Sequence, residues 1–259
     1  MIEFRPLMVH GKPIGNGREP AVCVSLMATD RAALESELRL LMSRSPDLIE
    51  WRVDHFKGVS SVNEVLEAAA DLRDMARDLP LIFTYRSPKE GGAPSGLDAD
   101  AVGELIERVV KSGIFEFVDV EFSMPRDRAL AIIAAARACG VQVIVSSHDF
   151  AGTPSEEDLY HRLTESAALG ADVAKLAVMP SAMSDVIRLL SATERAHRDL
   201  RIPLITMAMG SLGIVTRVFG GMFGSALTFA AGTQASAPGQ LPIEQLREIL
   251  EAVRAKRVP

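Results

Sequence analysis

Eight short apolar or β-branched runs recur along this 259-residue chain, and a longer stretch of helical periodicity follows each of them. Each interval between two runs has room for one strand, one helix and two loops. Strands that are buried on both faces read as nearly continuous apolar runs, so the pattern predicts a parallel sheet covered by helices. The runs begin near Ala21, Leu48, Leu81, Phe115, Val141, Val173, Pro203 and Ser225.

Eight β/α units in succession favour a (β/α)8 TIM barrel, and the length of the chain is usual for one such domain. A doubly wound open sheet is the alternative, but no Gly-x-Gly-x-x-Gly follows the first run and no Walker motif occurs. We therefore predict one barrel domain over residues 1–259. Within it, residues 1–18 are expected to form a short β-hairpin that closes the bottom face, and residues 231–240 a lid loop over the active face.

The segments between the runs predict seven helices with clear limits. Gly113, Gly140 and Gly170 end three of them, as expected of residues that adopt the left-handed conformation at helix C-termini. The connection over 210–221 is short and weakly periodic, so the helix expected there is the least defined. The seven predicted helices span residues 31–44, 61–78, 99–113, 126–140, 153–170, 183–199 and 242–257.

Composition excludes several classes of function. Lys and Arg number 28 against 34 Asp and Glu, so the net charge of −6 leaves no basic footprint for nucleic acid or an anionic membrane. No apolar run of about 18 residues occurs, so no membrane span is expected, and no signal peptide is visible. Cys23 and Cys139, the two cysteines, both lie in apolar surroundings and are expected to be buried free thiols of a cytoplasmic protein.

Charged and polar side chains lie inside or just after the strand runs, where a barrel carries its chemistry. A buried charge costs several kcal/mol unless it is paired, so these groups form either a structural ring of ion pairs or an active site. Both interpretations stay open at this point. The groups are Ser25, Glu50, Arg52, Asp54, Arg86, Glu90, Asp119, Glu121, His148, Asp149 and Lys175.

Lys175 is the only one of six lysines inside a strand run. Strand alternation places it on the same face as Val173 and Ala177. It is a candidate imine-forming nucleophile, because burial and nearby arginines are expected to lower the pKa of its amine and only the neutral amine attacks a carbonyl. The alternative is a structural ion pair with Glu121.

His148 ends the preceding strand run, so it is expected one strand away from the lysine. A histidine in that place suits a proton shuttle beside an imine, although strand-end histidines are often structural. No second histidine has the spacing of a metal motif, so a metal site is unsupported. Four histidines are expected at the surface: His10, His55, His161 and His197.

Taken in order from about Val22 to Gln240, these segments closely resemble the type I 3-dehydroquinate dehydratases (3-dehydroquinases) of the shikimate pathway. The segments that carry the resemblance are EWRVD (50–54), YRSPKEGG (85–92), DVE (119–121), VIVSSHDF (143–150), AK (174–175), MAMG (207–210), Arg217, FGSALTF (223–229) and ASAPGQ (235–240). Ser147 departs from the family, which has a larger polar residue before the histidine. The departure alters packing beside His148 and leaves the chemistry intact.

The resemblance implies a hydro-lyase that converts 3-dehydroquinate to 3-dehydroshikimate. Lys175 would form a Schiff base with the ring ketone. His148 would remove the adjacent proton and protonate the departing hydroxyl, giving syn loss of water. Glu90 would hold the imidazole, fix its tautomer and favour its cation.

The resemblance also assigns the binding groups. Arg217 would bind the substrate carboxylate in a bidentate way. Ser236 and Gln240 would close over the substrate from the last loop. The ring hydroxyls and the pocket wall would be contacted by Glu50, Arg52, Arg86 and Ser25. No metal or organic cofactor is implied, because the lysine supplies the electrophile, and the family implies a cytoplasmic homodimer.

Two other functions stay open. A class I aldolase shares the strand-borne lysine but often carries a Gly-rich phosphate loop, and residues 231–236 read AGTQAS instead. A non-enzymatic barrel that binds a small acid would keep Arg217 without needing Lys175 and His148. The presence of both favours an enzyme.

Overall fold

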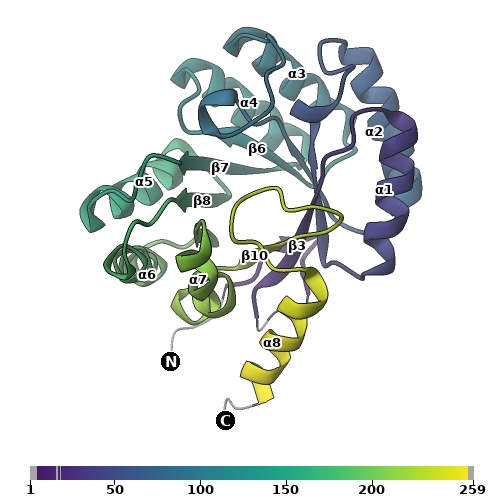
Figure 1. Cartoon of the computed structure of the whole chain (residues 1–259). Coiled ribbons are helices and arrows are strands. Elements are labelled where there is room, and N and C mark those ends of the chain that lie inside the picture. Colours follow the sequence, from purple (N-terminus) through teal and green to yellow (C-terminus); the bar gives the residue numbers. More distant parts are fainter. Residues whose placement is uncertain (1–4, 16, 18, 256–259) are drawn as a thin grey trace.

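Eight parallel strands curl into one barrel in this computed structural model, which describes residues 5–15, 17 and 19–255. The strand order runs from β10 through β3 to β9, and a bridge between Leu204 and Ser225 joins the two edges. The TIM barrel is thereby confirmed, and the open sheet is excluded (Figure 1). The strands are β3 (Ala21–Leu26), β4 (Leu48–Arg52), β5 (Leu81–Thr84), β6 (Phe117–Glu121), β7 (Gln142–Asp149), β8 (Val173–Val178), β9 (Leu204–Ala208) and β10 (Leu227–Ala230).

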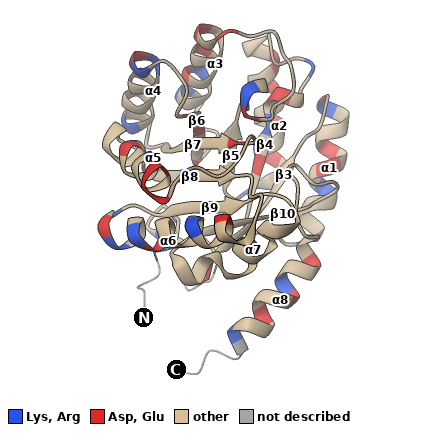
Figure 2. Cartoon of the chain, turned by 60° about the vertical axis from the view of Figure 1, so that its left-hand side comes forward, with Lys and Arg blue, Asp and Glu red and all other residues tan. Residues whose placement is uncertain are grey.

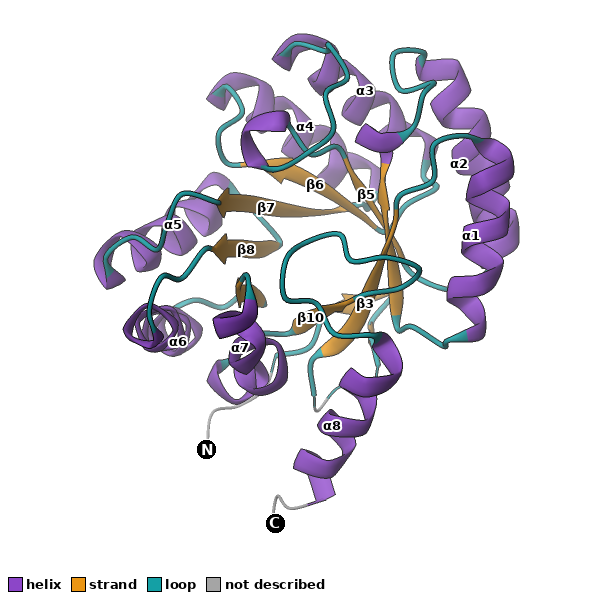
Figure 3. Ribbon diagram, in the orientation of Figure 1, coloured by secondary structure: helices purple, strands orange, loops and turns teal. Residues whose placement is uncertain are grey.

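The helices form the outer layer around the strands (Figure 3). Side chains of Asp30, Ser61, Asp98 and Ser155 accept backbone N–H groups at four helix starts, which satisfies donors that a helix start leaves free. The seven predicted helices are confirmed within a few residues, and the weak one is a six-residue helix. The helices are α1 (Arg31–Ser43), α2 (Val62–Ala76), α3 (Ala99–Ser112), α4 (Arg126–Cys139), α5 (Glu156–Leu169), α6 (Met183–Asp199), α7 (Ile214–Phe219) and α8 (Ile243–Ala255).

The inward-facing side chains of the strands form layers. At the bottom they are almost all apolar and make one buried cluster, which includes Leu48 on β4 and Phe117 on β6. The antiparallel hairpin of β1 (Met8–Val9) and β2 (Lys12–Pro13) adds Leu7 and Ile14 to the same cluster. The predicted hairpin is thus confirmed for the described residues, and positions 1–4, 16 and 18 lie outside them.

Two residues further along most strands, the inward side chains become polar. Leu48 is followed by Glu50, Phe117 by Asp119, and Val173 by Lys175, all of them buried. The buried apolar layer therefore forms the floor of the barrel interior, and the polar layer lies above it at the C-terminal ends of the strands. This change of polarity along the barrel axis positions the candidate site.

Two predictions about which side chains are buried are wrong. Cys23 is buried as expected, but Cys139 is exposed, because the last turn of α4 leaves it on the solvent side. His197 is buried rather than exposed, since it lies on the inner face of α6 beside Gly224. Charged groups of both signs are distributed over the outer helices (Figure 2). No helix in the described ranges has the length and apolar character to cross a bilayer.

Candidate active site

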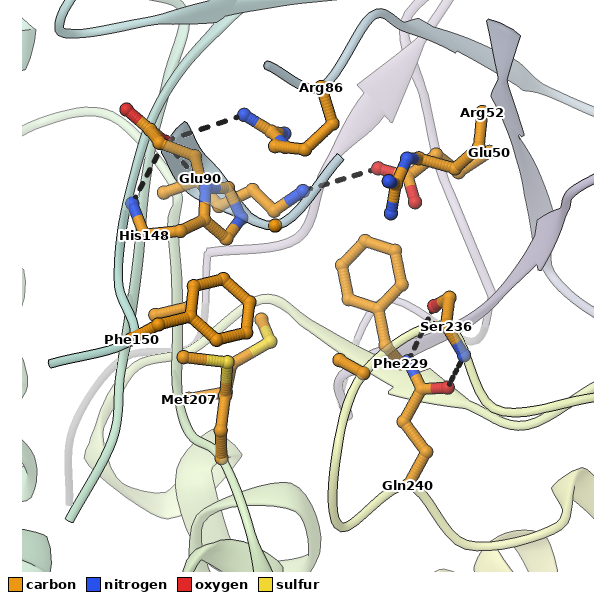
Figure 4. A pocket seen from close by; sticks show the side chains of 15 residues that line it. Glu50, Arg52, Arg86, Glu90, His148, Phe150, Met207, Phe229, Ser236 and Gln240 are labelled. Atoms are coloured by element: carbon orange, nitrogen blue, oxygen red, sulfur yellow. Dashed lines mark hydrogen bonds and ion pairs between the residues drawn. The ribbon is translucent and has the colours of Figure 1, made fainter. Parts of the chain in front are cut away.

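A pocket opens at the C-terminal ends of the strands. Figure 4 shows its charged side chains on one side, and Ser236 and Gln240 of the loop before α8 on the other. Among the described residues, no group of three or more His, Cys, Asp or Glu side chains is arranged to hold a metal ion. Eight of the predicted site residues line the pocket: Glu50, Arg52, Arg86, Glu90, His148, Lys175, Ser236 and Gln240.

Lys175 points into the barrel from the middle of β8, as alternation predicted. Its Nζ lies 3.2 Å from Glu50 Oε1 and 3.3 Å from Asp119 Oδ2, and 4.6 Å from the centre of the Phe229 ring. The ion pair proposed with Glu121 is wrong, because that carboxylate pairs with Arg86. The lysine therefore lies in the pocket wall between two carboxylates and is 5% exposed.

Glu50 is the carboxylate that faces both the pocket and the lysine. Ser25 Oγ donates to its Oε2 over 2.8 Å, and Thr84 Oγ1 donates to its Oε1 over 3.0 Å. Burial alone would raise the pKa of Glu50, but Lys175 and the neighbouring arginines outweigh it and lower the pKa to about 2. Glu50 is therefore ionised at neutral pH beside the amine.

His148 lies on β7, the strand next to the lysine. Its Nδ1 is 2.9 Å from Glu90 Oε2, and its backbone N–H donates to the same oxygen over 3.0 Å. Ser123 Oγ donates to the other oxygen of Glu90 over 2.9 Å. Two contacts from one residue fix the carboxylate against the ring, so the orienting role predicted for Glu90 has the required geometry (Figure 4).

The predicted preference of His148 for its cation is wrong. Burial, followed by the charges of Arg86 and Lys175, holds the pKa of His148 well below its usual range. Burial also raises the pKa of Glu90 to about 7, and the Glu121 carboxylate adds to the rise. The imidazole is therefore neutral at pH 7 and able to accept a proton, which is the state that a general base requires.

Glu90 comes from a short 3-10 turn over Pro88–Glu90. Glu121 Oε1 accepts the N–H of Ser87 over 2.8 Å, and Asp54 Oδ2 accepts the N–H of Ala93 over 2.9 Å. The two buried carboxylates thus hold both ends of the turn. Glu121 at the end of β6 and Asp54 just after β4 therefore help to determine where Glu90 lies.

Two arginines of the pocket are already paired. Arg86 lies 2.8 Å from Asp119 and 3.1 Å from Glu121, and Arg52 makes two contacts of 2.8 Å to Asp54. Paired guanidiniums stay rigid and keep further N–H groups for a polar ligand.

Arg217 differs from these two arginines. It is buried and lies outside the pocket lining, and its guanidinium donates to the backbone oxygens of Phe229 (3.3 Å) and Pro238 (3.1 Å). No carboxylate of the described residues pairs with it, and burial lowers its pKa to about 10. The charge of Arg217 is therefore not neutralised within the described part of the chain.

The loop between β10 and α8 crosses the barrel opening (Figure 1). Gln240 Nε2 donates to Ser236 Oγ over 2.9 Å, and Ser236 Oγ donates to Ser25 Oγ over 2.9 Å. Ser25 lies behind the pocket lining and in turn donates a hydrogen bond to Glu50. The loop is thus hydrogen-bonded to the polar layer of the barrel.

Three groups of the hydrogen-bond and ion-pair network around the pocket have no individual role predicted from the sequence. Asp119 contacts both Lys175 and Arg86, and its alternation with Glu121 on β6 was the signal that could have assigned it. Ser146 donates to Asp119 over 2.6 Å. Ser123 follows a strand in a turn, where nothing in the sequence points to its contact with Glu90.

Comparison with known proteins places the chain in a family. Residues 22–257 match the model of the family "Type I 3-dehydroquinase". A 3-dehydroquinate dehydratase of Aromatoleum aromaticum is 43% identical over 98% of both chains, and one of Shouchella clausii is 44% identical over 94% of this chain and 97% of its own.

Two solved structures agree with these matches. A 3-dehydroquinate dehydratase from Geobacillus kaustophilus superposes with a TM-score of 0.94 at 42% identity, covering 97% of each chain. A type I enzyme from Clostridium difficile with covalently modified comenic acid gives 0.92 at 35% identity, covering 99% of this chain and 100% of its own. The chain therefore belongs to the type I 3-dehydroquinase family of enzymes.

Proposed function

We propose that this protein eliminates water from 3-dehydroquinate in a syn sense, giving 3-dehydroshikimate in the shikimate pathway, through a Schiff base on Lys175. One observation carries the proposal: an inward-facing lysine lies in the pocket next to the strand that bears a neutral, carboxylate-held histidine. The names of the relatives support the reaction. The covalently modified comenic acid in the Clostridium difficile structure supports covalent chemistry in this kind of site.

In the first step the neutral amine of Lys175 attacks the ring ketone, and loss of water leaves a protonated imine. The ammonium must give up a proton before attack, because only a free electron pair on nitrogen forms the new bond. The imine draws electrons from the adjacent carbon and makes its C–H acidic. His148, neutral in the buried pocket, takes that proton.

The electron pair of the broken C–H bond then forms the ring double bond and expels the hydroxyl group. His148 returns its proton to that hydroxyl, which departs as water. Hydrolysis of the imine releases the product and restores Lys175. One base on one side of the pocket serves both proton transfers, which accounts for a syn elimination.

The remaining groups suit a small polyhydroxy carboxylate. Glu50, Arg52 and Arg86 would bind ring hydroxyls from the pocket wall. Arg217 would bind the carboxylate, since its charge has no carboxylate partner among the described residues and a guanidinium matches a carboxylate in a bidentate way. Ser236 and Gln240 would close over the substrate, with residues 231–240 as the lid.

Borohydride reduction tests the proposal. Incubation with 3-dehydroquinate and borohydride should add the reduced substrate to the peptide containing Lys175, and turnover should give the ultraviolet absorbance of a conjugated enone. Lys175→Ala should lose both while keeping its fold by circular dichroism. A label on another residue refutes the imine on Lys175, cleavage of a carbon–carbon bond indicates an aldolase, and binding without turnover indicates a non-enzymatic barrel. Unfolding of Lys175→Ala would favour the structural ring of ion pairs.

The proposal extends to the organisation of the protein. We infer one barrel domain over residues 1–259, which acts as a cytoplasmic homodimer without metal or organic cofactor, as the family resemblance implies. Light scattering across a range of protein concentrations measures the oligomeric state, and a monomeric mass at all of them contradicts the dimer.

A further inference from the structure

Asp119 contacts two functional groups of the site from a position that a ligand in the pocket does not reach. The side chain is fully buried in the middle of β6 and is absent from the pocket lining. Its Oδ2 lies 3.3 Å from Lys175 Nζ, while its Oδ1 lies 2.8 Å from Arg86 Nη2 and accepts the Ser146 hydroxyl over 2.6 Å. One carboxylate thus contacts the candidate nucleophile and a candidate binding guanidinium at once.

We propose that Asp119 is the positioning residue that holds the amine of Lys175 in line for attack and balances the charge of the imine formed there. This inference rests on the function proposed above. Asp119 touches no substrate in this scheme, so it acts through Lys175 and Arg86.

The two carboxylates beside Lys175 have different surroundings. Glu50 lines the pocket and is also tied to Ser25 and Thr84, so an arriving substrate with hydroxyl groups competes for it. Asp119 lies behind the lining, so it stays beside the nitrogen throughout the reaction. An imine on Lys175 is a buried cation when protonated, and a fixed carboxylate near it lowers its energy because charges interact more strongly in the protein interior than in water.

Asp119 also separates two cations. Lys175 and Arg86 both contact it, and without this charge the ammonium would face the guanidinium across the barrel with only Glu50 as its own counterion. A buried cation that loses one of its partners moves or loses its proton. Either response displaces the nucleophile or changes the pH at which it reacts.

Groups from several strands surround Lys175 Nζ. Phe229 of β10 and Met207 of β9 bring no charge to the same space. Its titratable and charged neighbours are Cys23 from β3, Glu50 from β4, Asp119 from β6 and His148 from β7, and the same pocket is lined by Arg52, Arg86 and Glu90.

Asp119→Asn tests the inference, with Glu121→Gln as its matched control. Both changes remove a carboxylate that contacts Arg86 from the same strand, but only the first removes one from Lys175. The readout is the rate of borohydride trapping on Lys175 at saturating 3-dehydroquinate, measured from pH 5 to pH 10. Circular dichroism establishes that each variant is folded.

We expect Asp119→Asn to slow trapping by about 100-fold, the loss typical of a reacting group displaced by about 1 Å. Loss of the nearby negative charge favours the neutral amine, so the acid limb of the trapping profile should move to lower pH by about one unit. Asp119→Glu, which keeps the charge, should return the limb toward its wild-type position. Glu121→Gln should leave it in place.

The outcomes separate this inference from the function on which it rests. Absence of trapping in the wild-type protein overturns the proposed function itself. Trapping in the wild type with an equal profile in Asp119→Asn, or a slower rate without a shift of the limb, overturns the role of Asp119 alone. If Asp119→Asn does not fold, Ser146→Ala removes one hydrogen bond that orients the carboxylate and should slow trapping about 5-fold, the equivalent of roughly 1 kcal/mol. An unchanged rate in Ser146→Ala refutes the inference.

Discussion

Replacing Glu90 by Gln should change how the stability of the protein depends on pH. Burial, with the Glu121 carboxylate, raises the pKa of Glu90 from 4.5 to about 7. The difference of about 2.5 units, at about 1.36 kcal/mol per unit, corresponds to about 3 kcal/mol. The folded state binds this proton more tightly than the unfolded state, so the contribution is complete below pH 4.5 and is lost as the pH rises through 7.

Gln has nearly the same shape as Glu, and its amide oxygen still accepts a hydrogen bond from the His148 backbone N–H, but it does not titrate. The wild type loses this contribution to its free energy of unfolding as the pH rises, whereas the variant does not. Between pH 4.5 and pH 8 the free energy of unfolding of Glu90→Gln, relative to wild type, should rise by about 3 kcal/mol. Urea unfolding followed by the fluorescence of Trp51, the single tryptophan and fully buried, measures it.

Glu165→Gln is the control for removal of one negative charge, because Glu165 is an exposed residue of α5 away from the pocket. Its difference from wild type should stay constant over the same pH range. A constant difference for Glu90→Gln would refute the raised pKa. A fall in its relative stability with pH would mean that the Arg86 charge outweighs burial and that Glu90 is ionised throughout.

Three further changes test separate parts of the site. His148→Ala should retain the borohydride-trapped adduct by mass spectrometry but lose enone formation by about 100-fold or more, and loss of the adduct as well would argue against separate roles. Gly92→Ala should lower the unfolding free energy in urea by about 2 kcal/mol, because the new Cβ would lie 1.8 Å from the Arg86 carbonyl oxygen, whereas an unchanged midpoint would show that the turn relaxes. Arg217→Gln should raise KM by about 10-fold or more, since a charge-assisted hydrogen bond contributes roughly 1.5–3 kcal/mol, and an unchanged KM in steady-state assays would place the carboxylate elsewhere.

Most of the fold could be predicted from the periodicity of apolar residues along the chain. Continuous apolar runs show which segments are strands, and alternation within a run shows which side chains face inward. Lys175 is the clearest example, because Val173 and Ala177 lie in the interior cluster while Ala174 and Leu176 pack outside the barrel. Both the fold and the set of inward polar residues follow from these local patterns.

The charge state of His148 did not follow from the sequence. In water, a carboxylate next to an imidazole favours the imidazolium cation, so the contact with Glu90 predicts a charged histidine. In the folded chain burial dominates, and Arg86, Lys175 and Arg52 add repulsion from three other strands or loops. These cations are 27 to 96 residues away along the chain, so their combined effect exists only after the barrel closes.

The predicted ion pair of Lys175 with Glu121 is wrong, and the cause is again the three-dimensional geometry of the barrel. The backbone register aligns Lys175 with Ser146 on β7 and Ser146 with Glu121 on β6, so a flat sheet would place that glutamate level with the lysine. Strands in a barrel are tilted against its axis, so residues aligned in register lie at different heights. The carboxylate of β6 that contacts Nζ is instead that of Asp119, two residues earlier on the same inward face. Strand tilt thus decides which of the two acidic side chains of β6 contacts Lys175. The alternation of residues along the sequence gives no information about this tilt.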